Sequence, residues 1–287
     1  MILHQPTLQN TVMFDLVPAG GGAPYRIFLH IPAGEAPEDG WPALYMVDGN
    51  AVIATAVDIL RAQAPWPAGT GIGAGVLVAI GYPTEDAYDS VRRSWDLAPP
   101  PGRSFPPHRP GGPEVRTGGA EDFLRFIQTE LKPAIADLVK TDPTRQALWG
   151  HSFGGLFVLH SLFQDASAFT DWIAISPSIW WEDCALLAEA ERFAARKDGP
   201  PARIMLAVGE YEETLAPFQR HAPDAQKRAA DHKDHREVSR TQEMATFLAE
   251  IEGVTTSYHF LPGETHMSVL PQSLNLAIRF AFGLERD

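Results

Sequence analysis

Cysteine is nearly absent from this sequence, because Cys184 is the only one among 287 residues. A single thiol can form no internal disulfide and no cysteine-based zinc site, and it gives no sign of an oxidising compartment. The stretch from Met1 to Asn10 lacks the basic patch and apolar run of a secretory signal. No later run has the length and hydrophobicity of a membrane span. We therefore expect a cytoplasmic protein without a membrane partner, or a periplasmic one if an export signal was trimmed.

Positive charge is also scarce. The formal net charge is −13, and no basic run interrupts the acidic excess. The chain as a whole should repel nucleic acid and anionic membrane surfaces, so we expect neither as a partner. An anionic ligand would need a local cluster of arginine or lysine. The hydrophobic fraction of 45 % and the charged fraction of 21 % are typical of a globular protein with a sizeable core.

Eight short runs rich in β-branched and aliphatic residues predict strands, and segments with helical periodicity separate most of them. The first two runs flank the glycine-rich stretch Ala19–Ala23 and predict an antiparallel pair. From Ala43 onward strands and helices alternate, which predicts an α/β fold with parallel strands joined by right-handed crossovers. The expected strands are Thr11–Val17, Tyr25–Ile31, Ala43–Val47, Gly75–Ile80, Ala147–Trp149, Trp172–Ile175, Arg203–Val208 and Thr255–Phe260. The expected helices are Val52–Ala62, Ala120–Val139, Gly155–Phe163, Ala185–Ala195, Arg240–Ile251 and Leu274–Phe282, with a kink or reset at Pro133.

The segment Ala98–Gly119 differs in composition from the rest of the chain. It is dense in proline and glycine and carries Arg103, Arg109 and Arg116. One interpretation is a mobile surface loop. The other is a lid or rim beside the active site, because the segment follows the loop after the Gly75–Ile80 strand.

A second polar segment, Glu212–Glu237, contains His221, His232 and His235. The last two histidines have the i, i+3 spacing of neighbours on a helix. No paired carboxylate motif accompanies them, so the pattern predicts a solvated helix face and no metal site.

The motif with the strongest chemical meaning is Gly150-His-Ser-Phe-Gly154, which fits G-x-S-x-G. It lies where a strand ends and a helix begins. This context is typical of a nucleophile elbow, in which small residues allow a tight turn that lifts the serine hydroxyl out of the sheet. Ser152 is therefore the predicted nucleophile, and an ordinary turn is the alternative. The start of the following helix would direct the Phe153 N–H toward a developing oxyanion.

A serine nucleophile needs a base, and the elbow fold presents its partners in the order serine, acid, histidine. His266 lies after the last predicted strand and before the last predicted helix, so it is the expected base. The acid should follow the Arg203–Val208 strand, where the spacing after Gly209 favours Glu212 over Glu210. A Ser–His dyad without an acid is the alternative.

The second oxyanion donor should come from the loop after the Ala43–Val47 strand. Its sequence is Asp48-Gly49-Asn50, and we expect the backbone N–H of Asn50 to serve. The oxyanion is bound by backbone N–H groups, so the identity of the side chains in this loop is weak evidence for the donor.

Further segments run in order along nearly the whole chain: Tyr45–Asn50, Gly81-Tyr82, Arg93–Asp96, Gly118–Ala120, Trp149–Phe157, Ser176–Ser178 with Trp180-Trp181, Gly209-Glu210 and Gly263–His266. Taken together, these motifs resemble the esterase D-type family of esterases, and within it the siderophore esterases that hydrolyse enterobactin-like trilactones. The resemblance implies a single α/β-hydrolase domain over residues 1–287 and ester hydrolysis through an acyl-enzyme, without metal or cofactor. It also implies that Arg93 faces the substrate; a surface ion pair with Asp96 or Asp89 is the alternative.

The function expected from these features is a carboxylic ester hydrolase with a small-molecule ester substrate, which includes ferric siderophores. Trp95 and Trp180 could wall the pocket for aryl groups, with core packing as the alternative for the tryptophans. A general acyl or carbohydrate esterase and a peptidase would use the same triad. The alternative from another class is an inactive binding module on the same fold. Such a module would have lost the triad, whereas Ser152 and His266 are both present.

Overall fold

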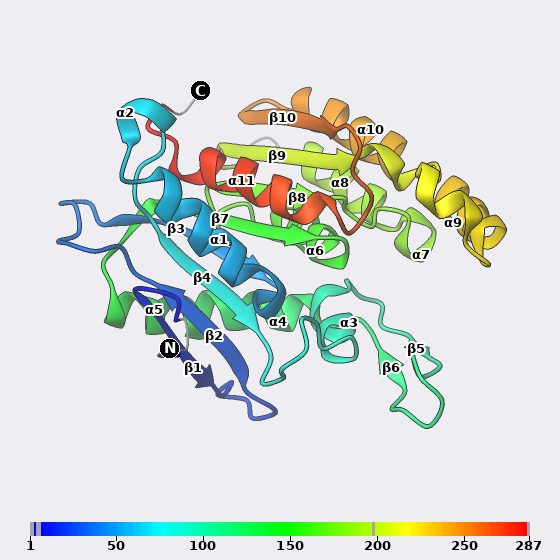
Figure 1. Cartoon of the computed structure of the whole chain (residues 1–287), viewed down its shortest axis with the longest axis horizontal. Helices are drawn as coiled ribbons and strands as arrows, with labels where there is room; N and C mark the ends of the chain where they lie inside the picture. The colour runs from blue at the N-terminus through cyan, green and yellow to red at the C-terminus, as the bar shows by residue number, and fades with distance from the viewer. Residues whose placement is uncertain (1–2, 4–6, 197–198, 286–287) are drawn as a thin grey trace.

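The structure, a computed structural model, describes residue 3 and residues 7–196 and 199–285. Within these residues, eight strands form one central sheet in the order β1-β2-β4-β3-β7-β8-β9-β10 (Figure 1). β1 and β2 are antiparallel, as are β2 and β4, whereas all neighbours from β4 to β10 are parallel. The expected α/β class is confirmed, as one domain with a mostly parallel sheet. The strands are β1 Thr11–Leu16, β2 Tyr25–His30, β3 Trp41–Val47, β4 Val76–Gly81, β7 Thr141–His151, β8 Asp171–Ile175, β9 Ala202–Gly209 and β10 Val254–Leu261.

Helices cover both faces of the sheet, which is why its central strands are continuous apolar runs rather than alternating ones. α1 (Gly49–Gln63) and α11 (Val269–Phe282) pack together on one face through residues such as Val57 and Ile278 (Figure 1). A larger apolar cluster, around Phe157 and Trp172, fills the other face. Its helices are α4 Ala120–Phe126, α5 Lys132–Leu138, α6 Phe153–Gln164, α8 Leu186–Ala194 and α10 Glu237–Ala249.

The helix expected over Ala120–Val139 is present but is not uniform. A π-helical stretch, η1 (Ile127–Leu131), joins α4 to α5. Pro133 has no N–H, and its ring would collide with the carbonyl of the residue four positions earlier in a regular α-helix. A wider turn just before the proline accommodates both features, as expected for a π-bulge.

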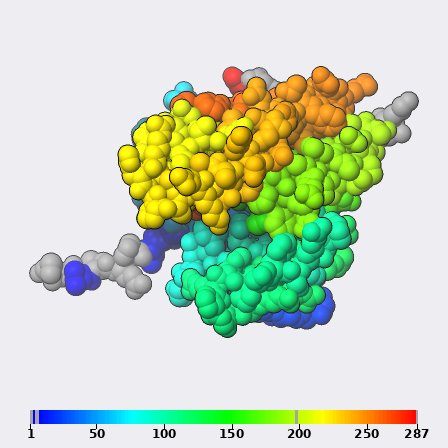
Figure 2. All heavy atoms as spheres, turned by 90° about the vertical axis from the view of Figure 1, so that its right-hand side faces the viewer, coloured from blue at the N-terminus to red at the C-terminus, as the bar shows by residue number. Residues whose placement is uncertain are grey.

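The carboxyl ends of the parallel strands meet at one end of the molecule, on the right in Figure 1. Two polar segments flank this end, and Figure 2 faces it, with yellow α9 (Ala225–His235) on one side and the green 98–119 segment on the other. α9 is the solvated helix expected around His232, and all its residues are exposed or half-buried.

The segment 98–119 folds into a short hairpin of β5 (Ser104–Phe105) and β6 (Val115–Arg116). It touches α7 (Trp181–Cys184): the ring centroids of Phe105 and Trp181 lie 5.3 Å apart, and Arg103 forms an ion pair of 2.8 Å with Glu182. These contacts hold the hairpin at the edge of the molecular end that carries the carboxyl ends of the parallel strands.

The short remaining elements lie in the connections between strands. Among the described residues, no helix has the length and apolar character needed to cross a membrane. The elements are α2 Pro67–Thr70, α3 Arg92–Leu97, η2 Glu210–Glu212 and η3 Pro217–His221.

Candidate active site

Ser152 occupies a strained turn between β7 and α6. Its backbone has φ 61° and ψ −118°, a conformation that non-glycine residues rarely adopt and that is held only where the surroundings enforce it. The glycines make this turn feasible: a Cβ at position 150 would come within 2.2 Å of the Gly154 carbonyl oxygen. The strand–turn–helix context expected for the G-x-S-x-G motif is present, and it leaves the Ser152 side chain only partly buried.

Ser152, His266 and Glu212 form one hydrogen-bonded line. The Nε2 atom of His266 is 3.0 Å from the Ser152 Oγ atom, and its Nδ1 atom is 2.5 Å from Glu212 Oε2. A carboxylate can only accept, so the imidazole proton lies on Nδ1, and Nε2 is left to accept the serine proton. This arrangement has the geometry of a nucleophile, a base and an orienting acid.

Glu212 is held in place from its other side. It lies in η2, directly after β9, and is 3 % exposed. Its Oε1 atom accepts hydrogen bonds of 2.6 Å from the Gly209 N–H and from the Ser176 hydroxyl. With the His266 contact on Oε2, these bonds compensate a buried charge that would otherwise be costly.

Glu210 has a different place. Its Oε2 atom accepts a hydrogen bond of 2.7 Å from the backbone N–H of Gly263, in the loop that carries His266. Glu212 therefore contacts the His266 side chain, whereas Glu210 contacts only the backbone of the loop that carries His266.

His151, the residue before the nucleophile, packs behind the histidine of the line. The two ring centroids, of His151 and His266, lie 4.6 Å apart. Burial lowers the pKa of His151 well below its usual value, and the neighbouring His266 lowers it further. His151 is thus a neutral wall that adds no positive charge beside the base.

The two candidate oxyanion donors come from the starts of two helices. Phe153 is the first residue of α6, and Asn50 lies in the first turn of α1. The Asn50 side chain is already occupied: its Nδ2 donates to the carbonyls of Tyr82 (3.0 Å) and Thr84 (3.1 Å), and its Oδ1 accepts from the Tyr82 N–H (2.9 Å). The side chain therefore holds the start of α1 to the segment after β4, and the backbone N–H of Asn50 is the candidate oxyanion donor.

Arg93 lies in α3 and pairs with neither Asp96 nor Asp89, so the surface ion pair considered as an alternative is wrong. It binds Asp48 at two points, Nε to Oδ1 at 2.8 Å and Nη2 to Oδ2 at 2.9 Å. Both side chains are largely buried, with 14 % and 3 % exposed. Burial has the largest single effect and would lower the pKa of Arg93, but the charge and hydrogen bonds of Asp48, with smaller effects of Tyr82 and Tyr88, together raise it. The guanidinium therefore stays charged, and it lies over the ring of Phe153.

The tryptophans separate into two environments. The Trp180 side chain lines the cavity in front of Ser152. Trp95 lies elsewhere, against Gly119 and with the Arg116 guanidinium 5.1 Å from its ring centroid. Trp95 belongs to the base of the 98–119 hairpin, so the structure does not bring it to the cavity wall where the sequence led us to expect it.

A cavity of about 370 Å³ opens in front of the Ser152–His266–Glu212 line. One wall is formed by α9, whose role here the sequence did not reveal. The i, i+3 spacing of His232 and His235 was the only signal, and it identifies a helix face but not what that face covers. The His235 imidazole stacks on Trp180 with centroids 3.8 Å apart and planes 2° from parallel. The lining residues are Ser152, Ser178, Trp180, Glu212, Gln219, Arg228, Asp231, His232, His235, Glu237, Thr265, His266 and Met267.

This fold and this site define an ester hydrolase of the α/β-hydrolase type. The chain belongs to the esterase family described as "Putative esterase", which matches residues 21–268. It is 36 % identical over 262 residues to the ferri-bacillibactin esterase BesA of Bacillus subtilis, covering 90 % of this chain and 84 % of that protein. It is 43 % identical over 206 residues to the siderophore enterobactin esterase of Emericella nidulans, covering 66 % of each. The solved structure of the siderophore hydrolase EstB from Aspergillus nidulans matches with a TM-score of 0.84 and 30 % identity, over 98 % of both chains.

Proposed function

We propose that this esterase hydrolyses siderophore-like trilactones through an acyl-enzyme formed on Ser152, with His266 as base and Glu212 as orienting acid. The observation that carries the proposal is the hydrogen-bonded line from Glu212 through His266 to Ser152, which ends at a cavity. The names of the related siderophore esterases support the substrate class.

In the first half-reaction, the Ser152 Oγ atom attacks the ester carbonyl carbon while its proton passes to His266 Nε2. The negative charge that develops on the carbonyl oxygen is met by the N–H groups of Phe153 and Asn50. The carbon–oxygen bond of the ester then breaks, and the leaving alkoxide takes the proton from Nε2. One lactone bond has become an acyl-enzyme and a free alcohol.

In the second half-reaction, water gives a proton to His266 Nε2 and adds its oxygen to the acyl carbon. The Ser152 oxygen leaves and recovers the proton, which releases a carboxylic acid. Glu212 remains ionised throughout and stabilises the imidazolium that forms twice in the cycle. The net change is the addition of one water across one ester bond.

Substrate charge is the second part of the proposal. A catecholate trilactone and its iron complex are anions, which a chain of net charge −13 repels at long range. Local cations must therefore attract them. Arg93 beside Phe153 and Arg228 on the α9 wall are the candidates, and Trp180 offers an aromatic face for an aryl ring.

Two experiments test the proposal. A covalent serine-directed probe should label the peptide that contains Ser152, and labelling elsewhere would contradict the assignment of the nucleophile. The kcat/KM for a catecholate trilactone, with and without iron, should greatly exceed that for a short neutral nitrophenyl ester. Equal values would favour a general carboxylesterase.

The 98–119 hairpin and the location of the enzyme complete the proposal. We infer that the hairpin is a rim of the substrate site, because Phe105 and Arg103 contact α7 next to Trp180. We keep the cytoplasm as the expected compartment on the sequence argument. Fractionation of cells, with the esterase activity followed in each fraction, tests it.

A further inference from the structure

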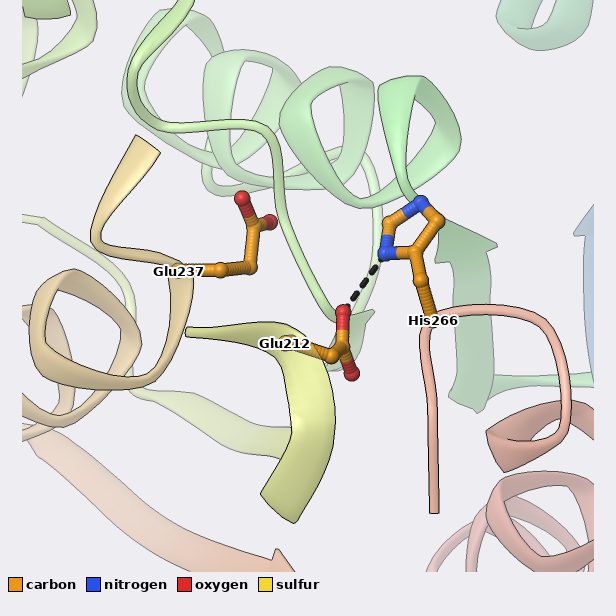
Figure 3. A group of neighbouring side chains, drawn as sticks. All are labelled: Glu212, Glu237 and His266. Atoms are coloured by element: carbon orange, nitrogen blue, oxygen red, sulfur yellow. Dashed lines mark hydrogen bonds and ion pairs between the residues drawn. The ribbon is translucent and has the colours of Figure 1, made fainter. Parts of the chain in front are cut away.

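A second glutamate lies buried beside the proposed triad and has no part in the reaction described above. Glu237 is the first residue of α10 and is 4 % exposed. Figure 3 shows it next to Glu212 and His266, and ligand atoms of the three side chains all lie within 4.8 Å of one another. All three residues also line the cavity.

The two carboxyl groups have unequal partners. Glu212 receives hydrogen bonds from Gly209 and Ser176 and holds the His266 imidazole. Glu237 lies close to the Trp180 side chain, which favours its ionised form, and its Oε1 atom makes no hydrogen bond to any described residue. Ionising both of these neighbouring buried carboxyl groups would cost a large electrostatic free energy. The proton therefore resides on Glu237, which has fewer hydrogen-bond donors around it than Glu212.

The charges around Glu237 point the same way. Burial raises its pKa well above the usual value, and the Glu212 charge raises it further; Glu213 adds to this, while the Trp180 side chain and Arg240 act in the opposite direction. Arg240 donates to the backbone carbonyls of Asp234 and His235, so its guanidinium is shared with the end of α9. His235 is half-buried, and burial lowers its pKa.

We propose that Glu237 is a positioning residue of the esterase site: as a neutral carboxylic acid it fixes Trp180 as the cavity wall without placing a second negative charge beside the Glu212–His266 pair. The inference rests on the proposed function of that pair. Trp180 in turn carries the stacked His235, so Glu237 also links the start of α10 to α9. A neutral group is required here because a charge next to Glu212 would compete for the imidazolium and hinder anionic substrates.

The protonation state can be measured without activity. The infrared difference between the wild type and Glu237→Gln at neutral pH should show the carbonyl stretch of a protonated carboxyl group. A carboxylate band in its place would overturn the proposal. The matched control is Glu243→Gln, an exposed glutamate on the same helix, which should show no protonated-carboxyl band.

Stability gives an independent measure with a defined sign. In the unfolded chain Glu237 loses its proton near the ordinary glutamate pKa, whereas the folded chain keeps it to higher pH. Above that ordinary pKa the folded state therefore binds about one more proton than the unfolded state, and stability falls as pH rises. The free energy of unfolding should fall more steeply with pH for the wild type than for Glu237→Gln. Parallel curves would overturn the proposal.

Kinetics test the positioning role. Glu237→Ala should raise the KM for aryl esters about five- to tenfold, the effect of losing one polar contact with Trp180, and should change kcat less. Glu237→Gln keeps a neutral polar group of the same length next to Trp180 and should recover most of that loss; failure to recover would contradict the proposal. If the pair instead held a divalent cation, chelation would lower activity, and that result would overturn it too. If Ser152→Ala stayed active, the proposed function would fail while the infrared and unfolding results would still stand.

Discussion

Asp48 and Arg93, forty-five positions apart, form a buried two-point ion pair beside the turn that carries the nucleophile. Asp48 lies between β3 and α1, as the N-cap residue of α1, in a left-handed conformation with φ 56°. Arg93 lies in α3 and contacts both Asp48 and the Phe153 ring. The pair therefore joins the loop that would supply one oxyanion donor to the residue that would supply the other. The Nη1 atom of Arg93 has no hydrogen-bond partner among the described residues. We propose it as a donor to an anionic substrate, although Arg93 is not one of the residues that line the cavity in front of Ser152.

The first prediction separates these two roles of Arg93. Changing Arg93 alone to Ala would strand a buried Asp48 charge and destabilise the protein by several kcal/mol, of the order of 3–5 kcal/mol. The double variant Arg93→Ala with Asp48→Asn removes the charge as well, and asparagine tolerates the left-handed backbone at position 48. In the double variant, kcat/KM for a catecholate ester should fall about ten- to a hundredfold, while a neutral nitrophenyl ester should be affected much less. Comparable losses on both substrates would show that the pair is purely structural.

The second prediction concerns the nucleophile and its base. Ser152→Ala and His266→Ala should each lower kcat by at least about a thousandfold, because each removes a group needed for the same proton transfer. The double variant should be hardly slower than either single variant. Losses that multiply would contradict a shared step. Thermal unfolding of each variant checks that the fold is intact.

A third prediction follows from the strained backbone of Ser152, where φ is 61°. Glycine adopts this region without the steric cost that alanine pays. Ser152→Gly should therefore be inactive but more stable than Ser152→Ala by about 1 kcal/mol, as measured by denaturant unfolding. An alanine variant as stable as the glycine variant would mean that the turn carries little strain.

The acid is tested by a matched pair of isosteric changes. Glu212→Gln should lower kcat by several orders of magnitude, because the amide cannot hold the imidazolium that forms in each half-reaction. Glu210→Gln removes only the charge from the contact with the Gly263 N–H and should cost much less. If both changes had equal, small effects, a Ser–His dyad would explain the activity.

The local features of this site could be predicted from the sequence, because each has a short-range pattern. The elbow around Ser152 is a contiguous motif. The acid follows the aliphatic run Arg203–Val208, and His266 follows the β-branched and aromatic run Thr255–Phe260. The Glu212 side chain reaches His266 across 54 positions, yet the order of elements was enough to suggest it. The eight expected strands all lie in the sheet, with ends that differ by a few residues at most except for β7, which begins six residues earlier than expected.

Contacts between distant segments could not be predicted in this way. Nothing near Arg93 in the sequence distinguishes Asp48 from the closer Asp89 and Asp96, and only the fold decides among them. The position of α9 at the cavity could not be predicted either, because a polar helix has no apolar stripe that indicates which part of the protein it packs against. Glu237 was missed for this reason: it follows a highly charged segment and looks solvated, but the chain turns there and buries it.

The last prediction concerns Asp96, a buried carboxyl group that forms no ion pair with any residue the structure describes. Asp96 accepts hydrogen bonds from the hydroxyls of Tyr25 (2.9 Å) and Tyr82 (3.0 Å). Burial raises its pKa from 3.8 to about 6, even though both tyrosines act to lower it. Between these two pH values the folded chain keeps a proton that the unfolded chain has lost. The contribution of Asp96 to the free energy of unfolding should thus fall by about 3 kcal/mol as the pH rises from below 4 to above 6, because each pKa unit is worth about 1.4 kcal/mol.

Asp96→Asn has no proton to lose, so its stability relative to the wild type should rise over this pH range and then level off. Tyr25→Phe supplies the opposite control: it removes a hydrogen bond that favours the ionised form, so it should raise the pKa of Asp96 and extend the fall in stability to higher pH. Urea unfolding at a series of pH values measures all three proteins. A constant difference between the wild type and Asp96→Asn from pH 4 to 7 would mean that the Asp96 carboxyl is ionised throughout, with the two tyrosine hydroxyls enough to hold its charge.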